Sequence, residues 1–89
     1  MRVSSELLLR EIAGEHILVP VGETALRIHG MITLSDSGVL LWEKLQNETT
    51  KQDLVHAILQ AYDVEEATAQ QDVDSFLAKL HDLGLITGA

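Results

Sequence analysis

Apolar residues follow two different patterns along the chain. In residues 1–30 they form short runs rich in leucine, isoleucine and valine, and turn residues such as Ala13-Gly14 and Gly22-Glu23 separate these runs. Short apolar runs joined by two-residue turns are typical of antiparallel β-strands. The pattern therefore predicts a three-stranded antiparallel meander, with strands at about residues 7–12, 15–20 and 24–28.

From Ile32 onward the apolar residues recur every three or four positions, which is the period of an amphipathic helix. Ser35 and Thr50 are favoured N-cap residues, and an acidic residue follows each of them where the helix dipole stabilises it. Gly84 suits the end of the last helix, and an apolar tail that can close onto the core follows it. The sequence predicts three helices, at about residues 36–46, 51–62 and 65–82.

Strands followed by helices in a chain of 89 residues predict an α+β fold. A three-stranded meander needs a cover for its apolar face, and the apolar stripes of the helices supply one. A chain of this length has room for one hydrophobic core. We therefore expect a single domain over residues 1–89, with a winged helix-turn-helix-like arrangement in which the wing comes first and Trp42 lies in the core.

Composition and charge exclude several classes of protein. The chain has no cysteine, which excludes disulfides and thiolate metal sites. Six basic and fourteen acidic residues give a net charge of −8, and this charge repels the phosphates of nucleic acid. There is no signal-peptide pattern, and no apolar run approaches the roughly 20 residues that span a membrane. The sequence predicts a cytoplasmic protein that binds neither nucleic acid nor membrane.

Candidate catalytic groups are present but do not form a recognised pattern. No two of the four histidines are three or four positions apart, so solvated histidines are favoured over a metal site assembled by the fold. Pairs of acidic residues, such as Glu65 and Glu66, favour a solvated helix surface over acid–base chemistry. Glycine-rich phosphate loops and a nucleophilic serine motif are missing. We expect no catalytic residue, no metal and no cofactor.

The predicted sheet could bind an extended peptide. An edge strand at 24–28 has unpaired backbone groups, to which an extended peptide can add as a further strand. The alternative is an edge that is merely short and capped. On the last helix Asp72, Phe76 and Lys79 share one face, where they either line a cleft or are simply solvated. The candidate peptide-binding residues are Thr24, Ala25, Leu26, Arg27, Ile28, His29, Asp72, Val73, Phe76 and Lys79.

Several stretches, in order and spacing along nearly the whole chain, resemble the PqqD family. This family comprises small peptide-binding proteins of pyrroloquinoline-quinone (PQQ) biosynthesis and related peptide-maturation systems. The matching stretches are Leu8 to Glu15, Leu18 to Glu23, Gly30 to Ser35 with Gly38 and Trp42, Tyr62 to Val64, and Asp72-Val73, Phe76-Leu77, Leu80 and Gly84 to Ile86.

The resemblance implies a winged-helix fold that does not bind DNA, known as a precursor-peptide (RiPP) recognition element. In such proteins the leader of a ribosomally made peptide docks as a strand against the third strand, and the third helix lines the other wall. The protein acts as a peptide chaperone for a maturase, typically a radical S-adenosylmethionine (SAM) enzyme. This chain has Ile28-His29-Gly30 where the family has a Phe-Asn-Gly-like sequence, so its side-chain preference for the peptide can differ.

Two functions of other classes remain as alternatives. A winged-helix transcriptional regulator is disfavoured, because residues 65–82 carry five acidic residues and only Lys79 as a basic one. A homodimerisation module would pair the edge of the third strand with that of a second copy. The partners implied are thus a leader peptide, a radical SAM maturase and, in the last case, a homodimer.

Overall fold

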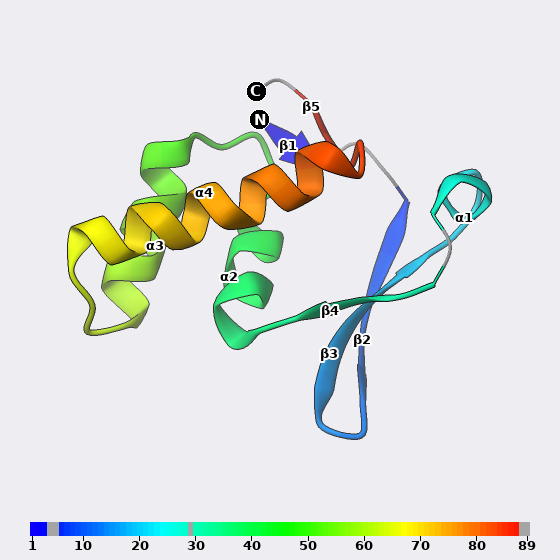
Figure 1. Cartoon of the computed structure of the whole chain (residues 1–89), viewed down its shortest axis with the longest axis horizontal. Helices are drawn as coiled ribbons and strands as arrows, with labels where there is room; N and C mark the ends of the chain where they lie inside the picture. The colour runs from blue at the N-terminus through cyan, green and yellow to red at the C-terminus, as the bar shows by residue number, and fades with distance from the viewer. Residues whose placement is uncertain (4–5, 29, 88–89) are drawn as a thin grey trace.

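The computed structural model describes residues 1–3, 6–28 and 30–87, and Figure 1 shows a twisted three-stranded sheet beside a layer of helices. Among these residues no helix is both long and apolar enough to cross a membrane. The elements follow in the order β1 (Arg2–Val3), β2 (Leu7–Ile12), β3 (Glu15–Pro20), α1 (Thr24–Arg27), β4 (Ile32–Leu34), α2 (Asp36–Lys44), α3 (Lys51–Ala61), α4 (Glu66–Asp82) and β5 (Ile86–Thr87).

β2 and β3 form an antiparallel hairpin over the ranges that the sequence predicts, and Leu8 lies opposite Val19 in its register. The turn consists of Ala13 and Gly14, whose φ angles are 53° and 81°. Two positive φ angles in a two-residue turn are typical of type I′, which follows the right-handed twist of paired strands. The local sequence therefore determines this hairpin.

The third strand of the sheet is not the predicted segment 24–28. β4 pairs antiparallel with β3 instead, so the strand order is β2-β3-β4. Residues Thr24–Arg27 form the one-turn helix α1. The buried Thr24 hydroxyl accepts a hydrogen bond from the Glu6 N–H at 3.1 Å. This contact anchors the start of α1 to Glu6, the residue before β2.

The three longer helices lie within two residues of their predicted ranges, and the predicted caps are present. The Ser35 Oγ accepts a hydrogen bond from the Gly38 N–H at 3.1 Å, and the Thr50 Oγ1 accepts one from the Asp53 N–H at 3.1 Å. Each bond satisfies a backbone donor that has no partner inside the first turn of its helix. The starts of α2 and α3 are thus fixed by their cap residues.

The C-terminal end of α4 returns the chain to the core. Gly84 has a φ of 71°, and the N–H groups of Gly84 and Leu85 donate to carbonyls in the last turn of α4. This pattern is a Schellman motif, which favours glycine at the left-handed position. Leu85 and Ile86 are buried, as the sequence predicts, but the pairing of β5 with β1 is a feature that the sequence does not indicate.

The core lies between one face of the sheet and the helices. Leu18 of β3 and Ile32 and Leu34 of β4 join a cluster with buried residues of α2, α3 and α4. Trp42 is 4% exposed within this cluster, which confirms its predicted place in the core. The prediction of an α+β fold with an N-terminal three-stranded antiparallel sheet is confirmed.

Candidate functional site

The first group of candidate residues, 24–29, does not form the edge strand that the sequence predicts. Thr24 is buried and Ile28 packs against the core. His29 lies outside the described residues. The exposed residues of α1 are Ala25, Leu26 and Arg27. A one-turn helix has no unpaired strand ladder, so the reason given for peptide binding at this segment is wrong.

The edge strand that leads into the helical layer is β4. Within the described residues β4 pairs with β3 on one side and has no strand on its other side. An unpaired edge offers backbone N–H and C=O groups to an added strand. Ile32 and Leu34 are buried, whereas Thr33 is exposed. β4 then passes directly into Ser35, the N-cap of α2, so this edge lies next to the start of a helix.

Two neighbouring hollows lie at the start of α2. The first, the α2–α4 hollow, has a volume of about 290 Å³. Asp72, Phe76 and Lys79 of α4 all line it, so the structure brings together these three candidate residues. The remaining lining residues are Ser35, Ser37, Gly38, Leu41 and Ser75.

The second hollow, called the Tyr62 hollow, has a volume of about 280 Å³. Its apolar wall is made of Ile58 at the end of α3 and of Tyr62 and Val64 from the loop before α4. Tyr62 and Val64 are 38% and 37% exposed, which is high for large apolar side chains. The two hollows share Ser35, Ser37 and Asp72. We refer to the two together as the groove.

Gly38 is the point at which β4, α2 and α4 meet. A methyl group added at Gly38 would lie 3.4 Å from the Cβ of Leu34 and 3.5 Å from a ring carbon of Phe76. The end of β4 and the aromatic wall of the α2–α4 hollow are therefore within a side chain's reach of each other.

The groove carries charge of both signs. Asp36 and Asp72 line the Tyr62 hollow, and Lys79 lines the α2–α4 hollow with Asp72. Asp36 lies in the first turn of α2, where the helix dipole favours a negative charge. The His16 Nε2 lies 3.6 Å from the Asp36 Oδ1. The groove thus offers two carboxylates and one ammonium group for charge contacts with a ligand.

One candidate of the second group is not available to a ligand. Val73 is completely buried in the core, because it lies one position away from the exposed face that carries Asp72 and Phe76. The sequence does not indicate the wall opposite α4. These residues are Ser35, Ser37, Gly38, Ile58, Tyr62 and Val64. Three residues, Ile32, Thr33 and Leu34, are too short a run to locate β4 from the sequence.

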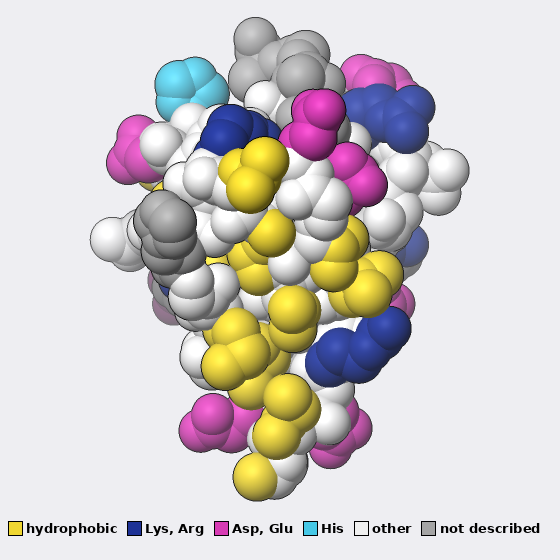
Figure 2. Space-filling view, turned by 90° about the vertical axis from the view of Figure 1, so that its right-hand side faces the viewer, with side chains coloured by type: hydrophobic (Ala, Val, Ile, Leu, Met, Phe, Trp, Pro, Cys, Tyr) yellow, Lys and Arg dark blue, Asp and Glu magenta, His cyan; other side chains and the backbone are white. Residues whose placement is uncertain are grey.

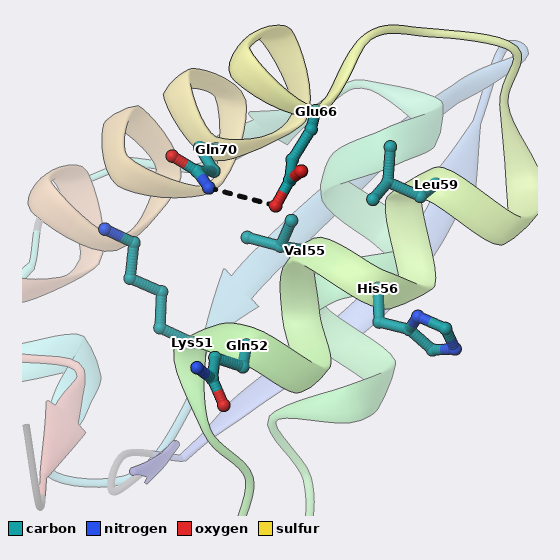
Figure 3. A pocket seen from close by; sticks show the side chains of 7 residues that line it. All are labelled: Lys51, Gln52, Val55, His56, Leu59, Glu66 and Gln70. Atoms are coloured by element: carbon teal, nitrogen blue, oxygen red, sulfur yellow. Dashed lines mark hydrogen bonds between the residues drawn. The ribbon is translucent and has the colours of Figure 1, made fainter.

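A larger hollow of about 410 Å³ lies between α3 and α4, and no residue of the sheet or of α2 lines it. Figure 3 shows the Gln70 amide directed at Glu66 above Val55, with His56 turned away from them. The Gln70 amide donates to the Glu66 carboxylate at 3.4 Å, and Lys51 forms an ion pair with Asp74. Because several of its polar groups bond to neighbours in the protein, this hollow is a weaker candidate than the groove.

Comparisons with known proteins agree with this geometry. The solved structure described as TbiB1 in complex with the TbiA(beta) leader peptide is similar to this chain with a TM-score of 0.76 and 25% sequence identity. The match covers 100% of this chain and 98% of that chain. No curated protein matches the sequence. The family model described as coenzyme PQQ synthesis protein D (PqqD) matches residues 15–86. This match confirms the predicted resemblance, and the chain therefore belongs to the PqqD family.

Proposed function

We propose that the chain binds the leader of a ribosomally made precursor peptide by strand addition to the free edge of β4. The observation that carries this proposal is the edge of β4, which no strand of the described residues pairs with and which passes directly into a groove lined by Asp72, Phe76 and Lys79. The edge supplies backbone hydrogen bonds, and the groove supplies pockets for alternate side chains of the added strand. The structural similarity to a protein in complex with a leader peptide supports the same function.

The groove contributes most of the selectivity. β4 is three residues long, so it offers only a few backbone hydrogen bonds, each worth about 0.5–1.5 kcal/mol net. Micromolar binding requires about 8 kcal/mol. The remainder comes from apolar contacts with Phe76 and Tyr62 and from charge contacts with Asp72 and Lys79. The leader is therefore expected to combine apolar side chains with charged ones.

The role is that of a binding protein that acts without a cofactor or metal of its own. The protein would hold the leader so that a separate maturase modifies the rest of the peptide, and the family resemblance implies a radical SAM enzyme. Such a chaperone works in the cytoplasm, where precursor peptides are made. A homodimer that paired two β4 edges would occupy the same backbone groups, so leader binding would compete with dimer formation.

Titration with a fluorescein-labelled leader peptide tests this function. The probes are the leaders of candidate precursor peptides from the same genome, and a labelled DNA duplex of similar size is the control. We expect saturable binding of the leader and no binding of DNA, because the chain carries a net charge of −8. DNA binding without leader binding would instead support a transcriptional regulator.

A further inference from the structure

The Tyr62 hollow differs from the α2–α4 hollow in the sign of its charges. Its charged lining residues are Asp36 and Asp72, and among the described residues no Lys or Arg lines it. The α2–α4 hollow instead contains Lys79 beside Asp72. An ammonium or guanidinium group that entered the Tyr62 hollow would therefore meet two carboxylates and no Lys or Arg of the protein.

The two carboxylates of this hollow are open to a cation from outside the chain. Within the described part of the chain Asp72 forms no ion pair, whereas Asp74, two positions later, pairs with Lys51. The side chain of Asp36 is 86% exposed, and its Oδ1 lies 3.6 Å from the His16 Nε2. Histidine neutralises a carboxylate only when it is protonated. Neither carboxylate is therefore neutralised by a permanent charge of the protein.

The apolar wall of the hollow suits the stem of a long basic side chain. Ile58 is buried, and Tyr62 and Val64 are partly exposed beside it. Lys and Arg bury their methylene stems against apolar surface and keep the charged head among polar groups. A cation over the face of an exposed tyrosine ring also gains a cation–π contact. The wall and the two carboxylates together fit a basic side chain better than a purely apolar one.

The basic residues of the chain lie outside this hollow. Figure 1 shows the loop between α3 and α4, which carries Tyr62 and Val64, at the end of the molecule opposite α1. Figure 2 shows Lys and Arg side chains on the side that carries α1. The six basic residues are Arg2 in β1, Arg10 in β2, Arg27 in α1, Lys44 in α2, Lys51 in α3 and Lys79 in α4. With a net charge of −8, the field of the whole chain also attracts a basic ligand.

An acidic ligand group is the alternative, because the hollow includes the start of α2. The hydrogen-bonding groups there already have partners: the Ser35 Oγ accepts from the Gly38 N–H and lies 3.1 Å from the Ser37 Oγ. Asp36 places a carboxylate in the first turn of α2. A second carboxylate would lie near Asp36 and Asp72, and like charges repel. The charge of the hollow thus favours a cation over an anion.

We propose that the Tyr62 hollow receives a lysine or arginine side chain of the bound leader. This inference rests on the proposed leader-binding function. The two hollows of the groove share Ser35, Ser37 and Asp72. The basic residue of the leader therefore lies within a few positions of the residue that contacts Phe76 in the α2–α4 hollow. Its contacts with Asp36 and Asp72 distinguish leaders that carry a basic residue at this position from leaders that do not.

The test is a double-mutant cycle between the full chain and a fluorescein-labelled leader that binds it. Each Lys and Arg of the leader is replaced in turn by methionine, a neutral side chain of similar length. The double variant Asp36→Asn and Asp72→Asn removes both carboxylates of the hollow. The matched control, Asp63→Asn and Asp82→Asn, removes the same charge at two exposed positions outside both hollows. Fluorescence anisotropy measures affinity at about pH 8, where a histidine is neutral.

We expect one methionine replacement in the leader to weaken binding to the unchanged chain about three- to tenfold. The same replacement should cost less than about twofold in the Asp36 and Asp72 double variant, and the full loss should remain in the control. A bound leader without such a position, or an equal loss in both double variants, would overturn this inference alone. Tighter leader binding by the Asp36 and Asp72 double variant would show that the hollow meets an acidic group, which also overturns it. A chain that binds none of the leaders would instead overturn the proposed function.

Discussion

Replacing Gly38 by alanine should stabilise the fold and weaken leader binding at the same time. Gly38 lies inside α2, where alanine is favoured over glycine by about 0.5–1 kcal/mol. The new methyl group would meet Leu34 and Ser35 at 3.4 Å and Phe76 at 3.5 Å. These are ordinary van der Waals distances, so no clash offsets the gain. For a domain of this size, the melting temperature should rise by about 2–8 °C.

The same methyl group would occupy space in the α2–α4 hollow, which Gly38 lines. A leader side chain that loses contact with one buried methylene loses about 0.8 kcal/mol, which is roughly a fourfold weaker affinity. Urea denaturation followed by the fluorescence of Trp42 measures stability, because Trp42 is the only tryptophan in the chain. Anisotropy of the labelled leader measures affinity.

Gly84→Ala is the matched control, since it adds the same methyl group at a position that lines neither hollow. Gly84 has a φ of 71°, where a side chain costs about 1–2 kcal/mol. This variant should therefore lose stability and keep its leader affinity. An unchanged affinity in Gly38→Ala would show that the leader does not enter the α2–α4 hollow. A loss of stability above about 1 kcal/mol in Gly38→Ala would refute the packing described around Leu34 and Phe76.

Two further predictions concern the core and the charges of the groove. Trp42→Ala should lower the free energy of unfolding by about 3–5 kcal/mol, because the ring is 4% exposed. Denaturation followed by circular dichroism measures this loss. A stable variant that merely lost leader affinity would place the ring in the groove. The double variant Asp72→Ala and Lys79→Ala should bind the leader roughly two- to fivefold more weakly at low salt. Its free energy of unfolding should stay within about 0.5 kcal/mol of that of the unchanged chain. Added salt should reduce the contribution of Lys79 to leader binding. The control is the double variant Lys51→Ala and Asp74→Ala, which removes an ion pair elsewhere on the surface and should leave leader affinity unchanged. Equal losses of affinity in the two double variants would indicate an effect of overall charge rather than of the groove.

The features that the sequence predicts correctly are those that neighbouring residues determine. Ala13 and Gly14 set the hairpin because both adopt positive φ angles between two apolar runs. Ser35 and Thr50 set the starts of two helices, since each cap bond reaches only three residues along the chain. Signals of this kind need no knowledge of the rest of the fold.

The misplaced third strand shows what local patterns cannot determine. Residues 24–28 contain β-favouring side chains, but Thr24 accepts a hydrogen bond from the distant Glu6, and β4 takes the place beside β3. β4 has only three residues, and its pairing with β3 depends on Ile32 and Leu34 filling the core. A run this short does not show a period.

The residues of the candidate site likewise fall into those that the sequence indicates and those that it does not. Asp72, Phe76 and Lys79 could be grouped from the sequence because the helical period places them on one face. Val73 belongs to the core because it is one position away from that face. Tyr62 and Val64 complete the groove from the loop before α4. Only the packed fold brings them close to Ser35, so no spacing in the sequence could have indicated them.

Amide hydrogen exchange with and without the leader tests the central claim most directly, because the two outer strands of the sheet, β4 and β2, serve as each other's control. If the leader adds to β4, amides of Met31 to Ser35 that face the free edge should gain protection when the leader is added. Amides at the opposite edge, on β2 (Leu7–Ile12), should exchange at unchanged rates. Protection that appears along β2, or at neither edge while the leader is bound, would contradict strand addition at β4.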